Sequence, residues 1–508
     1  MDRFFLPAAA LLLAAMACAQ VASIRLESQT FDEGTHLAAG LSYWKTGDYR
    51  MNPEHPPLPK LLCAVPLLFM NVRLPFEYPS WSQGNELDFG GQFLYANNLT
   101  ADQILFPARM VTIVLTLLLG VAMAWWTRRV FGAGEALLAL AFLAFDPNVI
   151  AQGRYVTTDL AVALFSFLAC VLWADALRTP TWLRVAAAGL ALGLALASKF
   201  NALFLIPALL VLTLFRWPGW KRVALLIAVA YVTLLVPYIP DLVRSPALVP
   251  HAYSTGLAML LDQDQHGRLS YLLGQISTRG WWYYFPVAYL VKTPVALLAS
   301  TLAAAVLYVA RRPKLPFEAL ALAVPAAIYW CFCLASHIDL GIRHLLPAYV
   351  LMIPLAATVV VRAAPKWLPI ALVVLLAVES ASIYPDYLAF FNWPSGGPSN
   401  GPRYLVDSNI DWGQDTKKLK TWLDARGIHE VCRVYFGMAV LSHYGIAELP
   451  LPANDDAAGR ANLDCWAAAS VTPLYGLHVA KDPYRWLREK QPVAKIGYSI
   501  YVYDLRKR

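Results

Sequence analysis

Long apolar runs are the feature that most limits what this chain can fold into. About eleven of them follow one another along the 508 residues, at approximately 4–24, 106–126, 134–151, 159–177, 183–198, 201–215, 223–240, 286–309, 317–335, 345–361 and 367–383. A helix of about 20 apolar residues spans the hydrocarbon core of a bilayer. With 58% hydrophobic and only 15% charged residues, this surface cannot be buried in one soluble core. The sequence predicts a mainly α-helical, polytopic membrane protein with about eleven transmembrane helices.

The first run has two interpretations. The segment MDRFFLPAAALLLAAMACAQVAS has a charged start, an apolar stretch and small residues around Ala17 to Ala19. This is the pattern of a signal peptide. The stretch from Phe4 to Ile24 is also long enough to remain as an uncleaved first helix. Both interpretations put the following residues on the outer side of the membrane.

Positive charges between the runs indicate the orientation. The connections predicted to face inward carry Arg128, Arg129, Arg178, Arg184, Arg216, Lys221, Arg222, Arg311, Arg312, Lys314, Arg362 and Lys366. The short outer turns carry only Arg154, Lys199 and Arg343. Because basic residues concentrate in cytoplasmic loops, the chain from residue 384 onward is expected outside the membrane.

Two domains follow from this topology. Residues 1–383 form the transmembrane domain, with a first outer loop at 25–105, and residues 384–508 form a soluble extracytoplasmic domain. In the latter, a helix at 414–426 and strands at 431–436, 468–472 and 496–504 predict a small α/β fold. Cys432 and Cys465 both belong to it, and whether they form a disulfide is left open.

Several classes of protein are excluded or disfavoured. The formal charge of +8 is not gathered into a basic patch with aromatic residues, so no nucleic-acid partner is expected. The chain has no Walker loop and no dinucleotide-binding glycine pattern. The seven cysteines form neither a zinc motif nor a redox motif.

Acidic residues gather at the outer ends of the predicted helices. Asp32 and Glu33 follow the first span, and Asp159 begins the span at 159–177. Charges at the centre of a membrane cost about 2.5–3.5 kcal/mol each, so those near spans are candidates for function. Asp159 has a second explanation, because a carboxylate at a helix N-terminus stabilises the helix dipole. If the two sites meet, they form one polar cavity.

Basic residues at the same membrane face are the second set of candidates. Lys199 separates two short spans, and Arg343 and His344 precede the span at 345–361. Lys199 has an alternative role as a lysine whose ammonium extends to the membrane–water interface. For Arg343 the alternative is that it does no more than form an ion pair with Asp339, four residues earlier on a helix. Glu54 and His55 supply just two donors for a metal ion, so no required metal is predicted.

Together these motifs resemble the protein O-mannosyltransferase and aminoarabinose-transferase superfamily, whose members are GT-C fold glycosyltransferases that use polyprenyl-phosphate sugars. The resemblance rests on Asp32-Glu33, the segment Asn52-Pro53-Glu54-His55-Pro56-Pro57, the turn at Asp159, Lys199 and Arg343-His344. It covers roughly residues 20–385. The tail, with the segment DSNIDWGQD at 407–415, is similar to the extension of a bacterial branch, which implies a plasma-membrane location.

The resemblance implies a role for each residue. Asp32 is the expected general base of an inverting transfer, and Glu33 and Asp159 orient hydroxyl groups or tune that base. Arg343 and Lys199 are expected to stabilise the departing lipid phosphate. The remaining substrate-binding candidates are His36, Glu54, His55, Arg154 and His344.

The expected function is therefore transfer of a sugar, mannose-like in the first instance, from a polyprenyl-phosphate donor to an extracytoplasmic protein, lipid or polysaccharide. Donor, acceptor and membrane lipids are the expected partners. A membrane transporter or lipid flippase is the alternative, in which such charges would line a pathway. A non-catalytic scaffold is the third interpretation.

Overall fold

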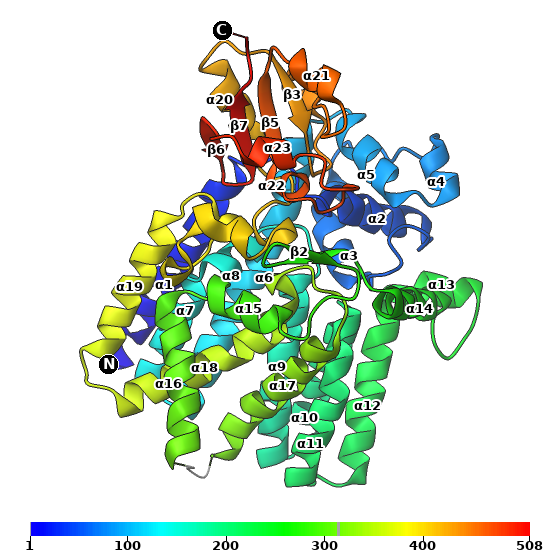
Figure 1. Ribbon diagram of the computed structural model, residues 1–508. Coiled ribbons are helices and arrows are strands. Elements are labelled where there is room, and N and C mark those ends of the chain that lie inside the picture. Colours follow the sequence, from blue (N-terminus) through cyan, green and yellow to red (C-terminus); the bar gives the residue numbers. More distant parts are fainter. Residues whose placement is uncertain (1, 312–314, 508) are drawn as a thin grey trace.

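The computed structural model describes residues 2–311 and 315–507, so Arg312 and Lys314 of the predicted inner loop lie outside the described residues. A helical bundle occupies one end of the molecule and a small sheet caps the other (Figure 1). The bundle comprises α1 (Asp2–Ile24), α6 (Ala101–Val130), α7 (Ala133–Ala144), α8 (Pro147–Gln152), α9 (Asp159–Arg178), α10 (Trp182–Leu196), α11 (Leu205–Phe215), α12 (Trp220–Leu235), α15 (Tyr284–Lys292), α16 (Val295–Arg311), α17 (Phe317–Ala335), α18 (Leu346–Ala363) and α19 (Leu368–Ser382).

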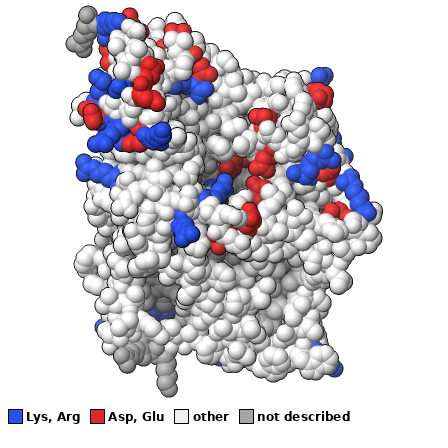
Figure 2. All heavy atoms as spheres, turned by 45° about the vertical axis from the view of Figure 1, so that its right-hand side comes forward, with Lys and Arg blue, Asp and Glu red and all other residues white. Residues whose placement is uncertain are grey.

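The predicted spans are present as helices. Among the described residues, six helices are long and apolar enough to cross a membrane, and all six coincide with predicted runs. Five shorter apolar helices coincide with the remaining runs. Few charges are visible on the lower half of the molecule, as expected for a surface in lipid (Figure 2). The chain is an integral membrane protein.

Helix α9 is the centre of the bundle. Its hydrophobic residues are buried, and α6, α10, α17 and α18 pack around it. Helix α10 also packs closely on α12 through Gly189 and Gly193, where an added Cβ would come within 2.8 Å of Leu226 O and 2.5 Å of Ala230 O. Small residues four apart allow this close approach of backbones in membrane helices.

Two predicted helices are broken, and for these the prediction of a continuous span was wrong. The run at 134–151 divides into α7 and α8, where the Asp146 carboxylate accepts hydrogen bonds from the amides of Asn148 (2.8 Å) and Val149 (3.1 Å). The run at 286–309 divides into α15 and α16 at Thr293-Pro294. Proline has no amide hydrogen to continue a helix, so the break has a local cause.

Two segments between the spans, predicted to lie outside the membrane and called the outer segments below, cover the end of the bundle. The first contains α2 (Glu33–Thr46), α3 (Leu58–Ala64), η1 (Val65–Phe69), α4 (Pro79–Gln83) and α5 (Glu86–Tyr95). The second contains α13 (Ile239–Arg244), α14 (His251–His266) and an antiparallel hairpin of β1 (Ser270–Leu272) and β2 (Gln275–Ser277). Short 3-10 turns η2 (Phe200–Phe204), η3 (Val236–Tyr238) and η4 (Ile342–Leu345) precede α11, α13 and α18.

The tail begins with turns η5 (Tyr387–Ala389), η6 (Trp393–Ser395), η7 (Pro398–Arg403) and η8 (Asp407–Asn409), which lie against the bundle, and continues into a five-stranded sheet of order β4-β3-β5-β7-β6. The strands are β3 (Glu430–Val434), β4 (Ala447–Pro450), β5 (Trp466–Ser470), β6 (Ala494–Ile496) and β7 (Ile500–Asp504). The other elements are α20 (Thr416–Asp424), η9 (Leu441–Tyr444), α21 (Ala457–Ala461), α22 (Val471–Leu474) and α23 (Arg485–Arg488).

The sheet differs from its prediction in two places. Strand β3 pairs in parallel with β4 and β5, whereas β7 is antiparallel to β5 and β6. The single strand predicted at 496–504 is a hairpin, because Gly497 and Tyr498 adopt left-handed conformations (φ 55° and 61°) that turn the chain. Strand β4 was missed. Cys432 and Cys465 form a disulfide with their Cα atoms 6.1 Å apart.

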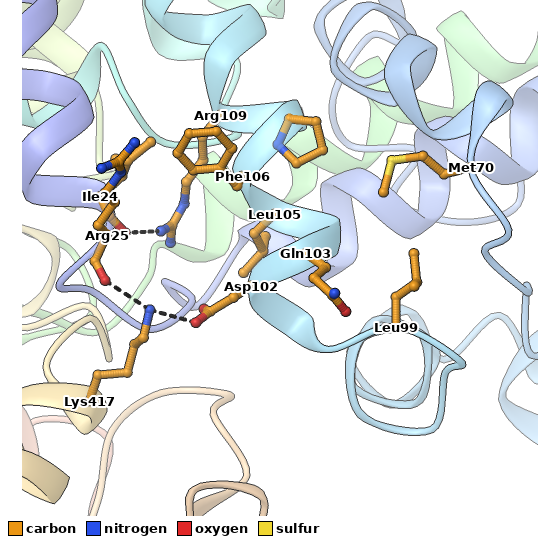
Figure 3. Close-up of a pocket in the computed structure, with 11 residues that line it drawn as sticks. Ile24, Arg25, Met70, Leu99, Asp102, Gln103, Leu105, Phe106, Arg109 and Lys417 are labelled. Atoms are coloured by element: carbon orange, nitrogen blue, oxygen red, sulfur yellow. Dashed lines mark hydrogen bonds and ion pairs between the residues drawn. The ribbon is translucent and has the colours of Figure 1, made fainter.

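Polar contacts fasten the tail to the bundle beside a groove of about 500 Å³ (Figure 3). Lys417 Nζ pairs with Asp102 Oδ2 (2.7 Å) near the start of α6 and donates to Arg25 O (3.1 Å) just after α1. Arg109 on α6 donates to Ile24 O (3.3 Å). These bonds fix the loop between α1 and α2, which carries Asp32.

Candidate active site

A cavity of about 820 Å³ opens where the bundle, the outer segments and the tail meet. Acidic and basic side chains gather in a hollow in the middle of the face seen in Figure 2. The predicted site residues that line the cavity are Asp32, His36, Glu54, His55, Lys199, Arg343 and His344. Segments distant in sequence therefore supply one polar wall.

Asp32 and Arg343 are in direct contact across this wall. Arg343 Nη1 donates to Asp32 Oδ2 at 3.1 Å, and the two side chains are 10% and 24% exposed, respectively. Asp32 immediately precedes α2, and Arg343 lies in η4. The guanidinium also lies over the ring of Trp412, 4.3 Å from its centroid. The carboxylate is thus held by a cation at the cavity surface.

Asp159 holds both cations without lining the cavity itself. Its Oδ1 accepts from Lys199 Nζ at 2.6 Å, and its Oδ2 lies 3.6 Å from Arg343 Nη1. An ammonium has three donors and a guanidinium has five. Lys199 uses one donor among the described residues, and Arg343 Nε has no partner there. Both cations line the cavity, and Lys199 keeps donors that a further anion could accept.

Glu33 points away from the cavity. Its carboxylate is fully buried and pairs with Arg109 through bonds of 2.5 and 2.8 Å. It also accepts from the amides of Thr30 (2.8 Å) and Val156 (3.1 Å). The structure thus separates Glu33 from its neighbour Asp32 and joins it to the supporting loops.

Arg154 is likewise outside the cavity. Its Nη2 pairs with Glu27 Oε1 at 2.6 Å and its Nη1 donates to Ser23 Oγ at 2.7 Å. Both ions are almost completely buried. This contact joins the turn before α9 to the end of α1, and the structure does not bring Arg154 to the other site residues.

The two histidines form an edge-on pair with ring centroids 5.3 Å apart. His36 Nδ1 is 3.0 Å from Val156 O, so Nδ1 carries the proton and donates to this carbonyl. Burial lowers the pKa of both rings, and His36 further lowers that of His55. Neutral imidazoles at this position can bond hydroxyl groups.

Glu86 joins the cavity beside Glu54 and was missed in the sequence. Asn52 Nδ2 donates to Glu54 Oε1 (2.8 Å) and to Glu86 Oε2 (3.3 Å). Lys60 Nζ in turn donates to Asn52 Oδ1 (3.1 Å). Desolvation, followed by the nearby Glu54 charge, raises the pKa of Glu86 to about 8. Glu86 precedes no recognisable motif, so the sequence offered no signal for it.

The segment DSNIDWGQD contacts both the turn that carries Arg343 and the loop that carries Asp32. Its Asn409 Oδ1 accepts from the amide of Ile342 (3.1 Å), which fixes the turn that carries Arg343. Its Trp412 carbonyl accepts from the amide of Phe31 (2.8 Å), which fixes the residue before Asp32. The high density of polar residues was the sequence signal that marked this segment. It did not reveal which residues the segment would contact.

Other cavity residues were not identified as site residues from the sequence. From the tail these are Asp407, Trp412, Phe436 and His478, and from α14, α17 and their flanking loops they include Leu257, Leu260, Leu261, Arg268, Tyr329, Phe332 and Ala335. Besides the charged residues, the cavity lining therefore includes aromatic residues from the tail and apolar residues from α14 and α17. Within residues 2–311 and 315–507, no group of three or more His, Cys, Asp or Glu residues has the arrangement of a metal site.

Comparisons with known proteins agree with this architecture. Residues 97–243 match the family model described as dolichyl-phosphate-mannose-protein mannosyltransferase. The structure superposes on ArnT from Cupriavidus metallidurans bound to undecaprenyl phosphate with a TM-score of 0.53, at 14% identity over 98% of this chain and 99% of that chain. The apo form of that protein gives a TM-score of 0.52, at 15% identity over 98% of both chains. No curated protein matches significantly in sequence. The ArnT comparisons show a shared fold along nearly the whole chain.

Proposed function

Because this chain has the GT-C fold of a glycosyltransferase superfamily, we propose that it transfers a sugar from a polyprenyl-phosphate donor to a hydroxyl group at the outer face of the plasma membrane. The family model's description makes mannose the first sugar to test. The undecaprenyl phosphate bound to the similarly folded ArnT supports a lipid-linked donor. The cavity, the tail and the first outer loop would then face the extracytoplasmic side.

Lys199 and Arg343 bind the donor phosphate in this proposal. They come from two different helix ends, share the Asp159 carboxylate and keep unused donors. Cations that are already in position stabilise charge developing on a leaving group without reorganisation. The apolar residues of α14 and α17 on one side of the cavity suit the polyprenyl chain.

Asp32 is the general base. The acceptor oxygen forms a bond to the anomeric carbon while the bond from that carbon to the phosphate oxygen breaks. The hydroxyl proton passes to Asp32, and the bonding electrons leave with the phosphate. Attack opposite the leaving group inverts the anomeric centre. Glu33 holds the loop of Asp32 through Arg109, rather than contacting the sugar.

One observation carries the proposal. A carboxylate and two cations, supplied by three separate helix ends, lie on one wall of a cavity with an apolar side. No nucleotide would be needed, because a lipid-linked sugar already carries its activating phosphate.

The test uses purified protein in nanodiscs with radiolabelled polyprenyl-phosphate sugars and acceptor-containing membrane extract. Release of polyprenyl phosphate is measured for the wild type, for D32N and for D48N, which changes a partly exposed aspartate of the same outer loop that pairs with Arg50. We expect D32N to reduce release about 100-fold to 10,000-fold, the usual contribution of a general base. D48N should retain full activity. Full activity in D32N would remove the assignment of the base, and no release from any donor by folded wild type would favour a transporter.

A further inference from the structure

The tail supplies part of the cavity wall. Asp407, Trp412, Phe436 and His478 all line the cavity and all come from the chain after residue 383. The part of the wall that comes from α14 and α17 is mostly apolar. If the lipid donor lies along the apolar part, the tail residues are left for the acceptor.

His478 is oriented by Asp407. His478 Nε2 lies 3.2 Å from Asp407 Oδ2. Asp407 is itself fixed, because its Oδ1 accepts from the Ser408 amide (2.5 Å) and its own amide donates to Thr472 Oγ1 (3.2 Å). A carboxylate only accepts, so Nε2 donates to Asp407 and Nδ1 is left for another partner. Apart from Asp407, no hydrogen-bond partner of this ring is present in the described parts of the chain.

Both partners have unusual backbone conformations. Asp407 has φ 58° and His478 has φ 60°, the left-handed region that residues other than glycine seldom adopt. Each such residue costs about 1–3 kcal/mol, and such strain concentrates at functional sites. Neither residue lies in a β-strand. The fold therefore holds both residues at the cavity surface in a backbone conformation that they would seldom adopt by themselves.

Stacked rings join the pair to the general base. His478 lies parallel to Phe436, with centroids 5.4 Å apart and planes within 7°. Phe436 stacks on Phe31 at 5.3 Å. Phe31 immediately precedes Asp32. The column places His478 on the same side of the cavity as Asp32, within reach of a molecule that Asp32 deprotonates.

We propose that His478, held by Asp407, binds a hydroxyl group of a saccharide acceptor and so determines acceptor specificity. This inference rests on the proposed function and names its acceptor class. Backbone pairing at a strand edge is one way to hold an extended peptide, and none of the four tail residues in this wall belongs to a strand that could provide it. Aromatic rings combined with a few fixed polar groups instead suit a small hydroxylated ring.

The test measures how much of the donor's sugar the enzyme transfers to a probe acceptor and how much it transfers to water. Wild-type protein in nanodiscs receives the radiolabelled donor, with methyl α-D-glucopyranoside, methyl α-D-mannopyranoside or a serine peptide as probe acceptors. The ratio of glycosylated probe to free sugar is compared for wild type, H478G, H478N and H429A. Glycine relieves the left-handed strain, asparagine tolerates it while keeping a polar group, and His429 is an exposed histidine of the same domain.

We expect H478G to lower the ratio for a glycoside about tenfold, the effect of one lost hydrogen bond, because transfer to the glycoside falls while release of free sugar to water does not. H478N should recover part of the loss, and H429A should match the wild type. An unchanged ratio in H478G, or transfer to the peptide and to neither glycoside, would overturn the inference while leaving the glycosyltransferase proposal intact.

A second measurement does not need turnover. Saturation-transfer NMR, without donor, measures binding of the two methyl glycosides to each variant. Weaker binding to H478G than to wild type supports the acceptor site. Equal binding, or none to wild type, contradicts it. Absence of polyprenyl phosphate release by the wild type would instead contradict the proposed function itself.

Discussion

Asp32 and Glu33 are neighbours in sequence, yet they belong to two ion clusters with different properties. Asp32 meets Arg343 at the cavity, where the carboxylate is 24% exposed and the guanidinium 10%. Glu33 meets Arg109 behind it, where exposure falls to 0% and 2%. Glu33 accepts four hydrogen bonds, two from Arg109 and two from backbone amides. Arg343 retains an unpartnered Nε. The cavity cluster, Asp32 with Arg343, can exchange partners with a substrate. In the buried cluster, Glu33 with Arg109, the hydrogen bonds of the carboxylate are already made.

The largest effect on binding of the lipid phosphate should come from Arg343, the cation that pairs with Asp32 at the cavity. R343A removes one of the two cations proposed for the phosphate, so we expect release of polyprenyl phosphate to fall about 100-fold to 1,000-fold. R343K should be intermediate, since a lysine keeps the charge without the planar fork. Binding of polyprenyl phosphate should weaken in parallel. R73A, at an exposed arginine of the outer loop, is the control. Normal phosphate binding by R343A would exclude the proposed role.

The buried cluster should affect stability instead of chemistry. E33Q leaves Arg109 charged and unpaired in the interior, at a cost of about 3–5 kcal/mol. We expect a lower melting temperature in detergent and less folded protein, with activity per folded molecule largely kept. E77Q, at an exposed glutamate, should melt like the wild type. If E33Q were as stable as wild type but inactive, Glu33 would belong to the chemistry and the contrast between the clusters would fail.

The smallest effect should come from Glu86, whose raised pKa makes stability depend on pH. The folded protein keeps a proton on this group up to about pH 8, whereas the unfolded chain releases it near 4.5. The folded state therefore binds more protons between these values, and stability falls as pH rises through that window. E86Q should flatten this part of the profile in melting experiments between pH 5 and 8. D88N, nearby on α5, should leave the slope unchanged, and an unchanged slope in E86Q would refute the assignment.

The helical part of the fold could be predicted because its signal is local. Hydropathy over about 20 residues indicates a span wherever it occurs, and the runs were found at nearly correct positions. The breaks at Asp146 and Pro294 were missed because apolar character continues across them, although both residues are helix-breaking or capping types. Strand β4 was missed because Ala447–Pro450 is exposed and carries no alternating pattern.

The site could be predicted only in part. Asp32, Lys199 and Arg343 carry charge at helix ends, which is unusual enough in a membrane protein to be recognised. Their mutual contact could not be predicted, since Asp32 and Arg343 are 311 positions apart. Successive residues of a helix point about 100° apart, so nothing local decides which of Asp32 and Glu33 faces the cavity. The contact between Asp407 and His478 could not be predicted from the sequence for the same reason.

The sequence by itself determined that this chain lies in a membrane, where along the chain its spans occur and which types of charge stand at their ends, because hydropathy and charge act residue by residue. The tertiary structure alone decided which of those charges keep unused hydrogen-bond donors and which are buried and complete. It also decided that the tail supplies a wall of the cavity. These properties depend on partners brought together from distant segments, and a carboxylate's role follows from those partners more than from its own chemistry.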